Sequence, residues 1–203
     1  MNTRTYSNTP SPTCDVRARI LTAAGERFAQ FGYNKTTMAE IAEDLGMSAA
    51  NLYRFFKSKQ DIAAACAERC LASRGECLKG IVAQQPMTAA EKLLAFVLED
   101  IRYTFERENE PKVNELISIV TREHKEIVLS NVESQCALIA EIIEQGNATG
   151  EFDVSDVEKT AGAIYSSLTL FEIPIFLPLF SKEQFEKMAR DLVELLLLGL
   201  NKR

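Results

Sequence analysis

Apolar residues recur every three or four positions along most of the chain, which is the period of an amphipathic α-helix. In the first such segment, residues 15–31, the apolar positions are Val16, Ile20, Ala24, Phe28 and Phe31. Gly32 follows directly and is a typical helix stop. No segment shows the strict apolar–polar alternation of a half-buried strand. The pattern therefore predicts an all-α protein.

Residues that favour helix starts and stops divide the rest of the chain into further helices. The predicted helices cover about residues 37–45, 49–56, 59–83, 88–108, 111–122, 124–145, 155–172 and 181–200, which gives about nine in all. Residues 146–150 are predicted to be a turn, and Pro174 and Pro178 interrupt the chain with an apolar loop. The polar, proline-containing residues 1–13 are predicted to be a disordered tail.

Residues 36–59 read TTMAEIAEDLGMSAANLYRFFKSK and form the most informative stretch. They predict two short amphipathic helices joined by a tight turn at Gly46. This is the helix-turn-helix arrangement, whose second helix lies in the major groove of DNA. Leu52 and Phe56 would anchor that helix, so that its polar side chains face outward.

This stretch, with the helix before it, resembles the TetR/AcrR family of bacterial regulators. The resemblance is carried by Ile20, Ala23, Phe28, Gly32, Thr36, Thr37, Ile41, Ala42, Gly46, Ser48, Leu52, Tyr53, Phe56, Lys57, Ser58 and Lys59. It covers about residues 15–60, and the rest is similar only in length and helical character. It implies a DNA-binding domain over residues 14–60, with the motif at about 36–55. Residues 61–203 would form a helical ligand-binding and dimerisation domain.

The resemblance also implies which residues contact DNA. They are Thr36, Thr37, Ser48, Ala49, Asn51, Tyr53, Arg54, Lys57 and Lys59. Thr37 is expected to bind a phosphate through its amide and hydroxyl. Ala49 stands where family members often carry Lys or Arg, so its contact would be with a thymine methyl group, and Arg54 becomes the main candidate for a guanine. Alternatively, Tyr53 packs internally.

Lys57 and Lys59 are expected to bind phosphates, the alternative being that they are solvated surface charges. The charge distribution favours a polyanion at this end of the chain. Residues 1–60 carry eight Lys/Arg and five Asp/Glu, a net charge of +3. The remaining residues carry 15 and 24, a net charge of −9. The overall charge of −6 is therefore the sum of a basic N-terminal segment and an acidic remainder.

The last predicted helix points to a dimer. Residues 192–200, LVELLLLGL, are apolar all round the helix, so this helix must be buried on more than one face. We expect one face to meet a second subunit beside the helix at 155–172. The candidate interface residues are Tyr165, Leu168, Leu192, Leu196 and Leu200. Such a homodimer would read a palindromic operator in double-stranded DNA. The alternative is a helix wholly buried within a monomer.

The family resemblance also implies a ligand pocket among the C-terminal helices. The candidate lining residues are Phe96, Asp100, Tyr103, Tyr165 and Phe171, with residues 173–180 as one wall. They predict a hydrophobic or amphipathic small-molecule ligand. Glu99, Asp100 and Glu172 also allow a cationic ligand, the alternative being that they form a solvated acidic face. The alternative for the aromatic residues is ordinary core, which is the commoner role of such residues at helical spacing.

Cys66, Cys70 and Cys77 share one predicted helix face and raise a metal- or redox-sensing hypothesis. The alternative is that they are small buried hydrophobes. His124, the one histidine, is expected at the surface, and we predict no metal site and no cofactor. The odd number of five cysteines, and the polar residues 1–13 in place of a signal peptide, predict a reducing cytoplasmic location.

The sequence contains no glycine-rich phosphate loop, paired histidine ligands or nucleophile elbow, so we predict no enzymatic activity. The longest apolar runs are far shorter than the ~20 residues that span a bilayer, so no membrane contact is expected. The sequence predicts a DNA-binding transcriptional regulator, preferentially a repressor that a small molecule releases from DNA. The alternatives are an activator, or a non-enzymatic helix-turn-helix adaptor that binds another protein.

Overall fold

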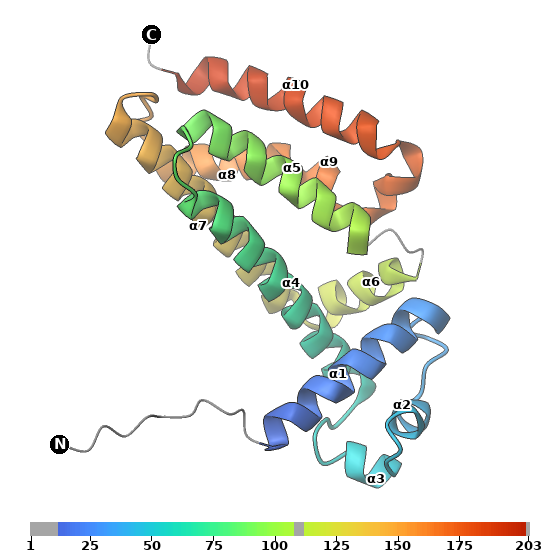
Figure 1. Ribbon diagram of the computed structural model, residues 1–203. Coiled ribbons are helices and arrows are strands. Elements are labelled where there is room, and N and C mark those ends of the chain that lie inside the picture. The colour runs from blue at the N-terminus through green and yellow to red at the C-terminus, as the bar shows by residue number, and fades with distance from the viewer. Residues whose placement is uncertain (1–11, 108–111, 202–203) are drawn as a thin grey trace, which may run out of the picture.

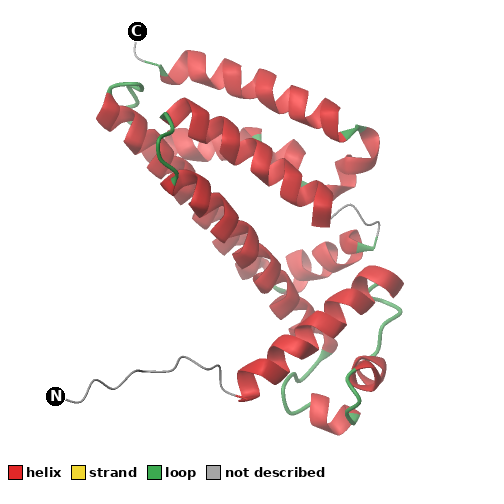
Figure 2. Ribbon diagram, viewed as in Figure 1, coloured by secondary structure: helices red, strands yellow, loops and turns green. Residues whose placement is uncertain are grey.

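The computed structural model describes residues 12–107 and 112–201. Within these residues the regular structure consists of ten α-helices and one 3-10 helix, and the lone β-bridge joins Phe152 to Asn201. Figure 2 shows the described chain as helices joined by loops. The all-α prediction is confirmed. Residues 1–11 of the predicted tail lie outside the described part, whereas Pro12 and Thr13 already belong to the first helix. None of the described helices is long and apolar enough to cross a membrane.

A small head forms one end of the molecule (Figure 1). It contains α1 (Pro12–Phe31), α2 (Met38–Asp44), α3 (Ala49–Leu52) and the start of α4 (Lys59–Ala83). Their apolar faces meet in a separate core that includes Ile20, Ala24, Phe28, Ile41, Leu52, Phe56 and Ile62. The helix-turn-helix predicted from residues 36–59 is therefore present, and it packs with α1 into one three-helix unit.

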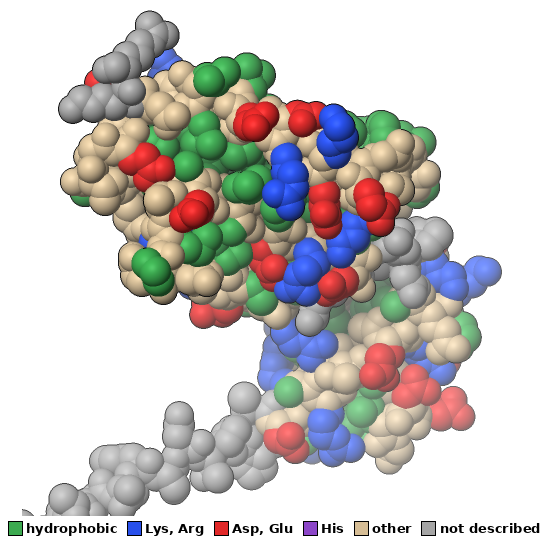
Figure 3. Space-filling model, turned by 45° about the horizontal axis from the view of Figure 1, so that its top comes forward, with side chains coloured by type: hydrophobic (Ala, Val, Ile, Leu, Met, Phe, Trp, Pro, Cys, Tyr) green, Lys and Arg blue, Asp and Glu red, His purple; other side chains and the backbone are tan. Residues whose placement is uncertain are grey.

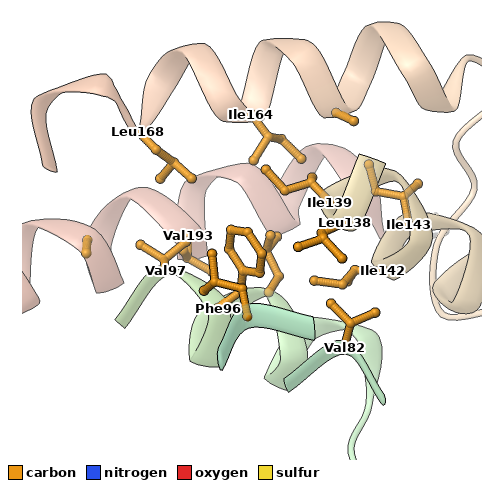
Figure 4. Packing of buried hydrophobic residues seen from close by; sticks show 14 of the residues in the cluster. Val82, Phe96, Val97, Leu138, Ile139, Ile142, Ile143, Ile164, Leu168 and Val193 are labelled. Carbon is orange, nitrogen blue, oxygen red and sulfur yellow. The ribbon is translucent and has the colours of Figure 1, made fainter. Parts of the chain in front are cut away.

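A larger body contains the remaining helices. They are α5 (Ala89–Arg107), α6 (Val113–Glu123), α7 (Lys125–Thr149), α8 (Val157–Ser167), α9 (Thr169–Glu172), the 3-10 helix η1 (Pro174–Leu179) and α10 (Lys182–Leu200). Its core lies between α4, α5, α7, α8 and α10. Figure 4 shows Phe96 of α5 among aliphatic side chains from the surrounding helices.

Two helices connect the head to the body. α4 contributes Ile62 and Cys66 to the head core, and further along it contributes Leu78 and Val82 to the body core. α6 packs against the head through Leu116 and against α7 of the body. A shift of α4 therefore changes the packing of both cores, and a shift of α6 changes its contacts with both the head and α7.

Several predicted helix starts are confirmed by their hydrogen bonds. Thr37 and Glu40 form a reciprocal capping box on α2, and Ser181 and Gln184 form another on α10. The hydroxyl of Ser58 accepts the amide hydrogen of Asp61 at the start of α4. Because these caps satisfy amides that the helices leave unpaired, local sequence fixes these starts well.

The predicted ends are less accurate. The turn placed at residues 146–150 is wrong, because α7 continues to Thr149 and ends at Gly150, which has a left-handed φ of 75°. Position 146 lies inside the helix, and it is a glycine for a packing reason rather than to form a turn. The Phe152 ring lies against it, and an added Cβ would come within 2.2 Å of that ring. The helix predicted at 155–172 starts at Val157, with Asp156 as its cap, and breaks at Leu168 into α8 and α9.

Candidate nucleic-acid interface

The turn between α2 and α3 is closed by backbone hydrogen bonds. Gly46 donates to the Glu43 carbonyl at 2.9 Å, and Met47 donates to the Ala42 carbonyl at 3.0 Å. The φ of Gly46 is +64°, in the left-handed region where a side chain is strained. The glycine therefore allows the sharp turn that separates the two helices of the motif.

α3 is anchored on one side and exposed on the other. Leu52 is fully buried, and Phe56 is 3% exposed. The hydroxyl of Ser48 caps the helix by accepting the Asn51 amide hydrogen at 3.2 Å. α3 itself ends at Leu52, and turns follow, so the helix predicted to reach Phe56 is shorter than expected.

Most of the predicted DNA contacts gather on the outer side of this segment. Ser48, Tyr53, Arg54 and Lys57 are exposed, and Ala49 and Asn51 are half-buried. Tyr53 is 51% exposed, which does not fit the alternative that it packs internally. The side chains of Ser48, Asn51 and Arg54 line a shallow surface hollow beside Gly46. Together they form a polar surface that carries the basic Arg54.

Thr37 is placed at the start of α2 as predicted, but its polar groups are already in use. Its backbone amide and its hydroxyl each lie 2.8 Å from Oε2 of Glu40, as hydrogen-bond donors to that carboxylate. The hydroxyl holds the pKa of Glu40 below its ordinary value of 4.5. A phosphate bound by Thr37 would have to displace this carboxylate, so the phosphate contact stays a prediction.

Two other predicted contacts point inward. Thr36 is 1% exposed, and its hydroxyl donates to the Gly32 carbonyl at 2.9 Å, which does not fit a contact between its side chain and DNA. The ammonium of Lys59 donates to the carbonyls of Tyr33 and Thr36, each at 2.7 Å, and lies over the Tyr33 ring. Burial lowers the Lys59 pKa. One of its three hydrogens remains for a phosphate, so that role also stays a prediction.

Two arginines of α1 position the motif, although sequence reasoning counted them only as charge. The guanidinium of Arg17 donates to the Phe55 carbonyl at 2.8 Å and stacks over the Phe56 ring at 4.1 Å. Arg27 binds Asp44 at 2.6 Å and lies 3.3 Å from Glu40. The hydrogen bond from Arg27 lowers the pKa of Asp44. Arg17 therefore holds the end of the segment at residues 48–57, here called the recognition segment, and Arg27 holds α2.

Comparison with protein families decides the identity of this arrangement. The model for bacterial regulatory proteins of the tetR family matches residues 20–66. The model for a tetracyclin repressor-like C-terminal domain matches residues 89–193, which is more than half of the chain. The chain belongs to the TetR family. It is therefore a DNA-binding helix-turn-helix transcription regulator and not an enzyme.

Known proteins agree with the TetR assignment. YvkB, an uncharacterized HTH-type transcriptional regulator from Bacillus subtilis (strain 168), is 39% identical over 61 residues. That match covers 30% of this chain and 32% of YvkB, so the chain spans about a third of the length of this relative.

Three solved structures share the fold. A transcriptional regulator from Cytophaga hutchinsonii ATCC 33406 is 22% identical, with a TM-score of 0.72 and coverage of 90% of this chain and 97% of that one. A TetR-family regulator from Pectobacterium atrosepticum has 21% identity, a TM-score of 0.73 and coverages of 97% and 99%. SmeT, the repressor of the Stenotrophomonas maltophilia multidrug efflux pump SmeDEF, has 20% identity, a TM-score of 0.70 and coverages of 92% and 90%.

The predicted pocket residues of this TetR-family chain lie inside the body. Phe96 is 1% exposed, and Phe171 is 4% exposed and packs edge-on against Phe185. Tyr165 is half-buried on α8. Asp100 is 3% exposed and forms an ion pair with Arg74 of α4. These contacts agree with a structural core, and the ligand-lining role stays a prediction.

Tyr103 and Gln135 add polar groups to this interior. The hydroxyl of Tyr103 donates to the Cys70 carbonyl at 2.9 Å, which ties α5 to α4. Gln135 of α7 is 2% exposed, and its amide nitrogen and oxygen both lack a hydrogen-bond partner among the described residues. Leaving such a group unpaired costs about 1–3 kcal/mol. Sequence reasoning missed Gln135, although a glutamine in the apolar stripe of a helix was the available signal.

The predicted dimer residues divide into two groups. Leu168 and Leu200 are 2% and 5% exposed and point into their own body, which does not fit an interface through these side chains. Tyr165, Leu192 and Leu196 are half-buried. The sequence prediction missed Leu195 and Leu198 of α10, which are 65% and 74% exposed. With the top of the molecule turned forward, Figure 3 shows hydrophobic side chains exposed between charged ones on the body.

The prediction that three cysteines share one face of α4 requires them to have similar surroundings, but their surroundings differ. Cys66 is buried, Cys70 is half-buried and Cys77 is exposed. Burial raises the pKa of the Cys66 thiol to about 11, so it is a poor nucleophile at neutral pH. Among the described residues, no group of three or more His, Cys, Asp or Glu side chains is arranged to hold a metal ion. The observed burial favours the reading of Cys66 as a small hydrophobe.

Proposed function

We propose that this regulator is a ligand-responsive repressor. It binds a palindromic operator as a homodimer, and a hydrophobic or amphipathic small molecule in the body lowers its affinity for DNA. The supporting observation is the anchored segment from Ser48 to Lys57, which turns Asn51, Tyr53 and Arg54 outward while Leu52 and Phe56 hold it to the head core. We place this activity in the cytoplasm, where bacterial DNA lies.

The dimer is supported by α10. Leu195 and Leu198 are large apolar side chains left exposed on a helix whose opposite side is packed into the body. Covering them with a second copy would remove them from water. A two-fold dimer brings two recognition segments to half-sites about one DNA turn, ~34–36 Å, apart.

Ligand response is supported by how α4 and α6 connect the head to the body. The α6 carboxylate of Glu115 accepts the Asn34 amide hydrogen of the head at 3.2 Å. α4 supplies core residues to both parts, as described above. A ligand that favours one arrangement of these helices shifts the spacing of the two heads in the dimer. The ligand then changes the affinity for DNA by the same factor by which DNA changes the affinity for the ligand.

The names of two solved structures of the same fold describe regulators, and one of them is a repressor. SmeT is a repressor of a multidrug efflux pump. FadR from Bacillus halodurans, a fatty acid degradation regulator, has 18% identity, a TM-score of 0.68 and coverages of 97% and 100%.

The first test is selection of bound duplexes from a random DNA pool by the full-length chain. We expect a palindromic consensus bound with steep salt dependence, and a promoter carrying it should be silenced in a reporter strain. Small-molecule panels are then screened for release of the labelled operator. Increased reporter expression would point to the activator alternative, and failure to enrich any duplex would point to the adaptor alternative.

A further inference from the structure

Gln135 is a polar side chain at a core position that the DNA-binding mechanism does not use. It is 2% exposed, and neither end of its amide has a partner among the described residues. A carboxamide offers two donor hydrogens and one acceptor oxygen. Since buried polar groups in proteins are almost always paired, this position is suited to a partner from outside the chain.

The direction of Gln135 follows from its helix. Leu138, Ile139 and Ile142 lie three, four and seven positions later, so they share its face of α7. Figure 4 shows Leu138 and Ile142 pointing toward Val82 of α4 and Phe96 of α5. Gln135 therefore faces the space between α4 and α5, one turn nearer the head.

The height of Gln135 along the bundle follows from contacts that join three helices. The ammonium of Lys92 donates to the Val82 carbonyl at 2.8 Å and to Oε1 of Gln145 at 2.6 Å, which places these residues of α5, α4 and α7 at one level. α4 and α7 pack side by side and run in the same direction (Figure 1). Gln135 is ten residues from this level, or about 15 Å along α7.

Two polar contacts between α4 and α5 lie on either side of the level of Gln135, one farther from the head and one nearer to it. The Arg74–Asp100 pair lies eight residues from the same level on both helices, or about 12 Å away. The bond from Tyr103 to the Cys70 carbonyl lies a further turn toward the head, at about 17 Å. Gln135 thus faces the interval between an ion pair and a tyrosine hydroxyl.

These surroundings are polar but carry no net charge. Arg74 and Asp100 neutralise each other, and the hydroxyl of the fully buried Thr104 donates to the Asp100 carbonyl at 3.0 Å. Phe96 and Ile101, which are almost completely buried, supply apolar neighbours on α5. A charged ligand group buried here would lose its hydration without gaining a counter-charge. A neutral polar group would lose less on burial, and hydrogen bonds to the Gln135 amide can offset that loss.

We propose that Gln135 is the polar anchor of the effector site, between α4, α5 and α7. The site takes an uncharged, mainly apolar molecule whose polar group both donates and accepts a hydrogen bond, such as a carboxamide or a lactam. This inference rests on the ligand-responsive function proposed above. Because α4 continues from this level into the head, an occupant here acts on a helix that positions the DNA-binding motif.

The test compares four probes with the same eight-carbon chain: octanamide, methyl octanoate, octanoate and octylammonium. Isothermal titration calorimetry of the full chain at neutral pH is expected to show octanamide binding at least tenfold more tightly than the other three. Gln135→Leu should abolish that preference. The matched control, Gln84→Leu at an exposed position after α4, should keep it.

Thermal melting separates loss of the site from loss of the fold. Gln135→Leu should melt at the same temperature as the original chain or higher, because it removes an unpaired buried amide. Gln135→Met serves as a second variant of similar shape. Equal binding of the four probes, no binding of octanamide, or an unchanged preference in both Gln135 variants would overturn the proposal.

Operator release distinguishes this site from the general function. If octanamide binds through Gln135 but leaves operator affinity unchanged, the site stands and ligand-responsive repression fails. If octanoate or octylammonium releases the operator and the Gln135 variants respond normally, repression stands and this site is wrong.

Discussion

The guanidinium of Arg74 and the carboxylate of Asp100 form a two-point ion pair inside the body, with Nε–Oδ1 and Nη2–Oδ2 distances of 2.5 Å. Their side chains are 5% and 4% exposed. A paired charge at this depth is tolerated because each partner replaces the water that the other has lost. The pair ties α4, which enters the head, to α5, which belongs to the body alone.

Breaking this pair from one side should destabilise the protein strongly. Asp100→Leu leaves a buried guanidinium without its carboxylate and is expected to lower the free energy of unfolding by about 3–5 kcal/mol. The double variant Arg74→Met/Asp100→Leu should recover most of that loss. Urea unfolding followed by circular dichroism measures both, and equal losses in the single and double variants would contradict this account.

Lys57 and Lys59 should behave differently on substitution. Lys57 is exposed, so Lys57→Ala is expected to weaken binding to all duplexes and to reduce the slope of log K against log salt by about one. Lys59 ties the α1–α2 loop to α4 through two carbonyls, so Lys59→Ala should mainly lower the melting temperature. A Lys57 variant with an unchanged salt slope would remove that residue from the interface.

Arg54 is expected to read a base rather than only a phosphate. It is exposed on the polar surface beside α3, and Arg commonly makes a bidentate contact with guanine. Arg54→Ala should cost about 1–3 kcal/mol on the selected operator and relax preference at one position of each half-site. Binding to a set of single-base operator variants checks this. A uniform loss across the set would reassign Arg54 to the backbone.

The sequence was sufficient where local chemistry decides the structure. The caps at Thr37, Ser58 and Ser181 and the apolar spacing of α1 each act within a few residues, so their helices could be placed correctly. The matches to the TetR-family models agree with the resemblance of the motif. Gly146 was misread as a turn, because its partner Phe152 becomes visible only once α7 and the following segment are folded together.

Long-range packing also decided which residues of the candidate sites are exposed. The sequence 192–200 is apolar on every face, so periodicity alone could not tell Leu198, which faces outward, from Leu200, which is buried. The inward placement of Lys59 likewise depends on carbonyls 26 and 23 residues away. The motif was therefore recognised from the sequence, whereas the orientation of individual side chains needed the structure.

The head should lose stability at acid pH through Arg27. The pKa of Glu40 lies below its ordinary value of 4.5, chiefly because of hydrogen bonds from Thr37 and to a smaller extent because of Arg27. The pKa of Asp44 lies below its ordinary value of 3.8 because of the hydrogen bond from Arg27. Their contribution is therefore present above these ordinary values and is lost as pH falls through the lowered ones. The difference in melting temperature between the original chain and Arg27→Met should shrink from pH 6 to pH 3. A constant difference over this range would show that the ion pairs contribute nothing.

The exposed leucines of α10 should decide the oligomeric state. Leu198→Glu places an unpaired carboxylate in the proposed interface twice, once from each subunit, because a two-fold interface repeats every substitution. A penalty of about 3 kcal/mol would raise the dimer dissociation constant at least ~100-fold. Sedimentation equilibrium measures this shift, and operator affinity should fall with it. The matched control is Leu129→Glu, at a leucine of α7 that is 57% exposed and outside the proposed interface. A Leu198→Glu protein that remains dimeric, or a Leu129→Glu protein that dissociates equally, would place the interface elsewhere.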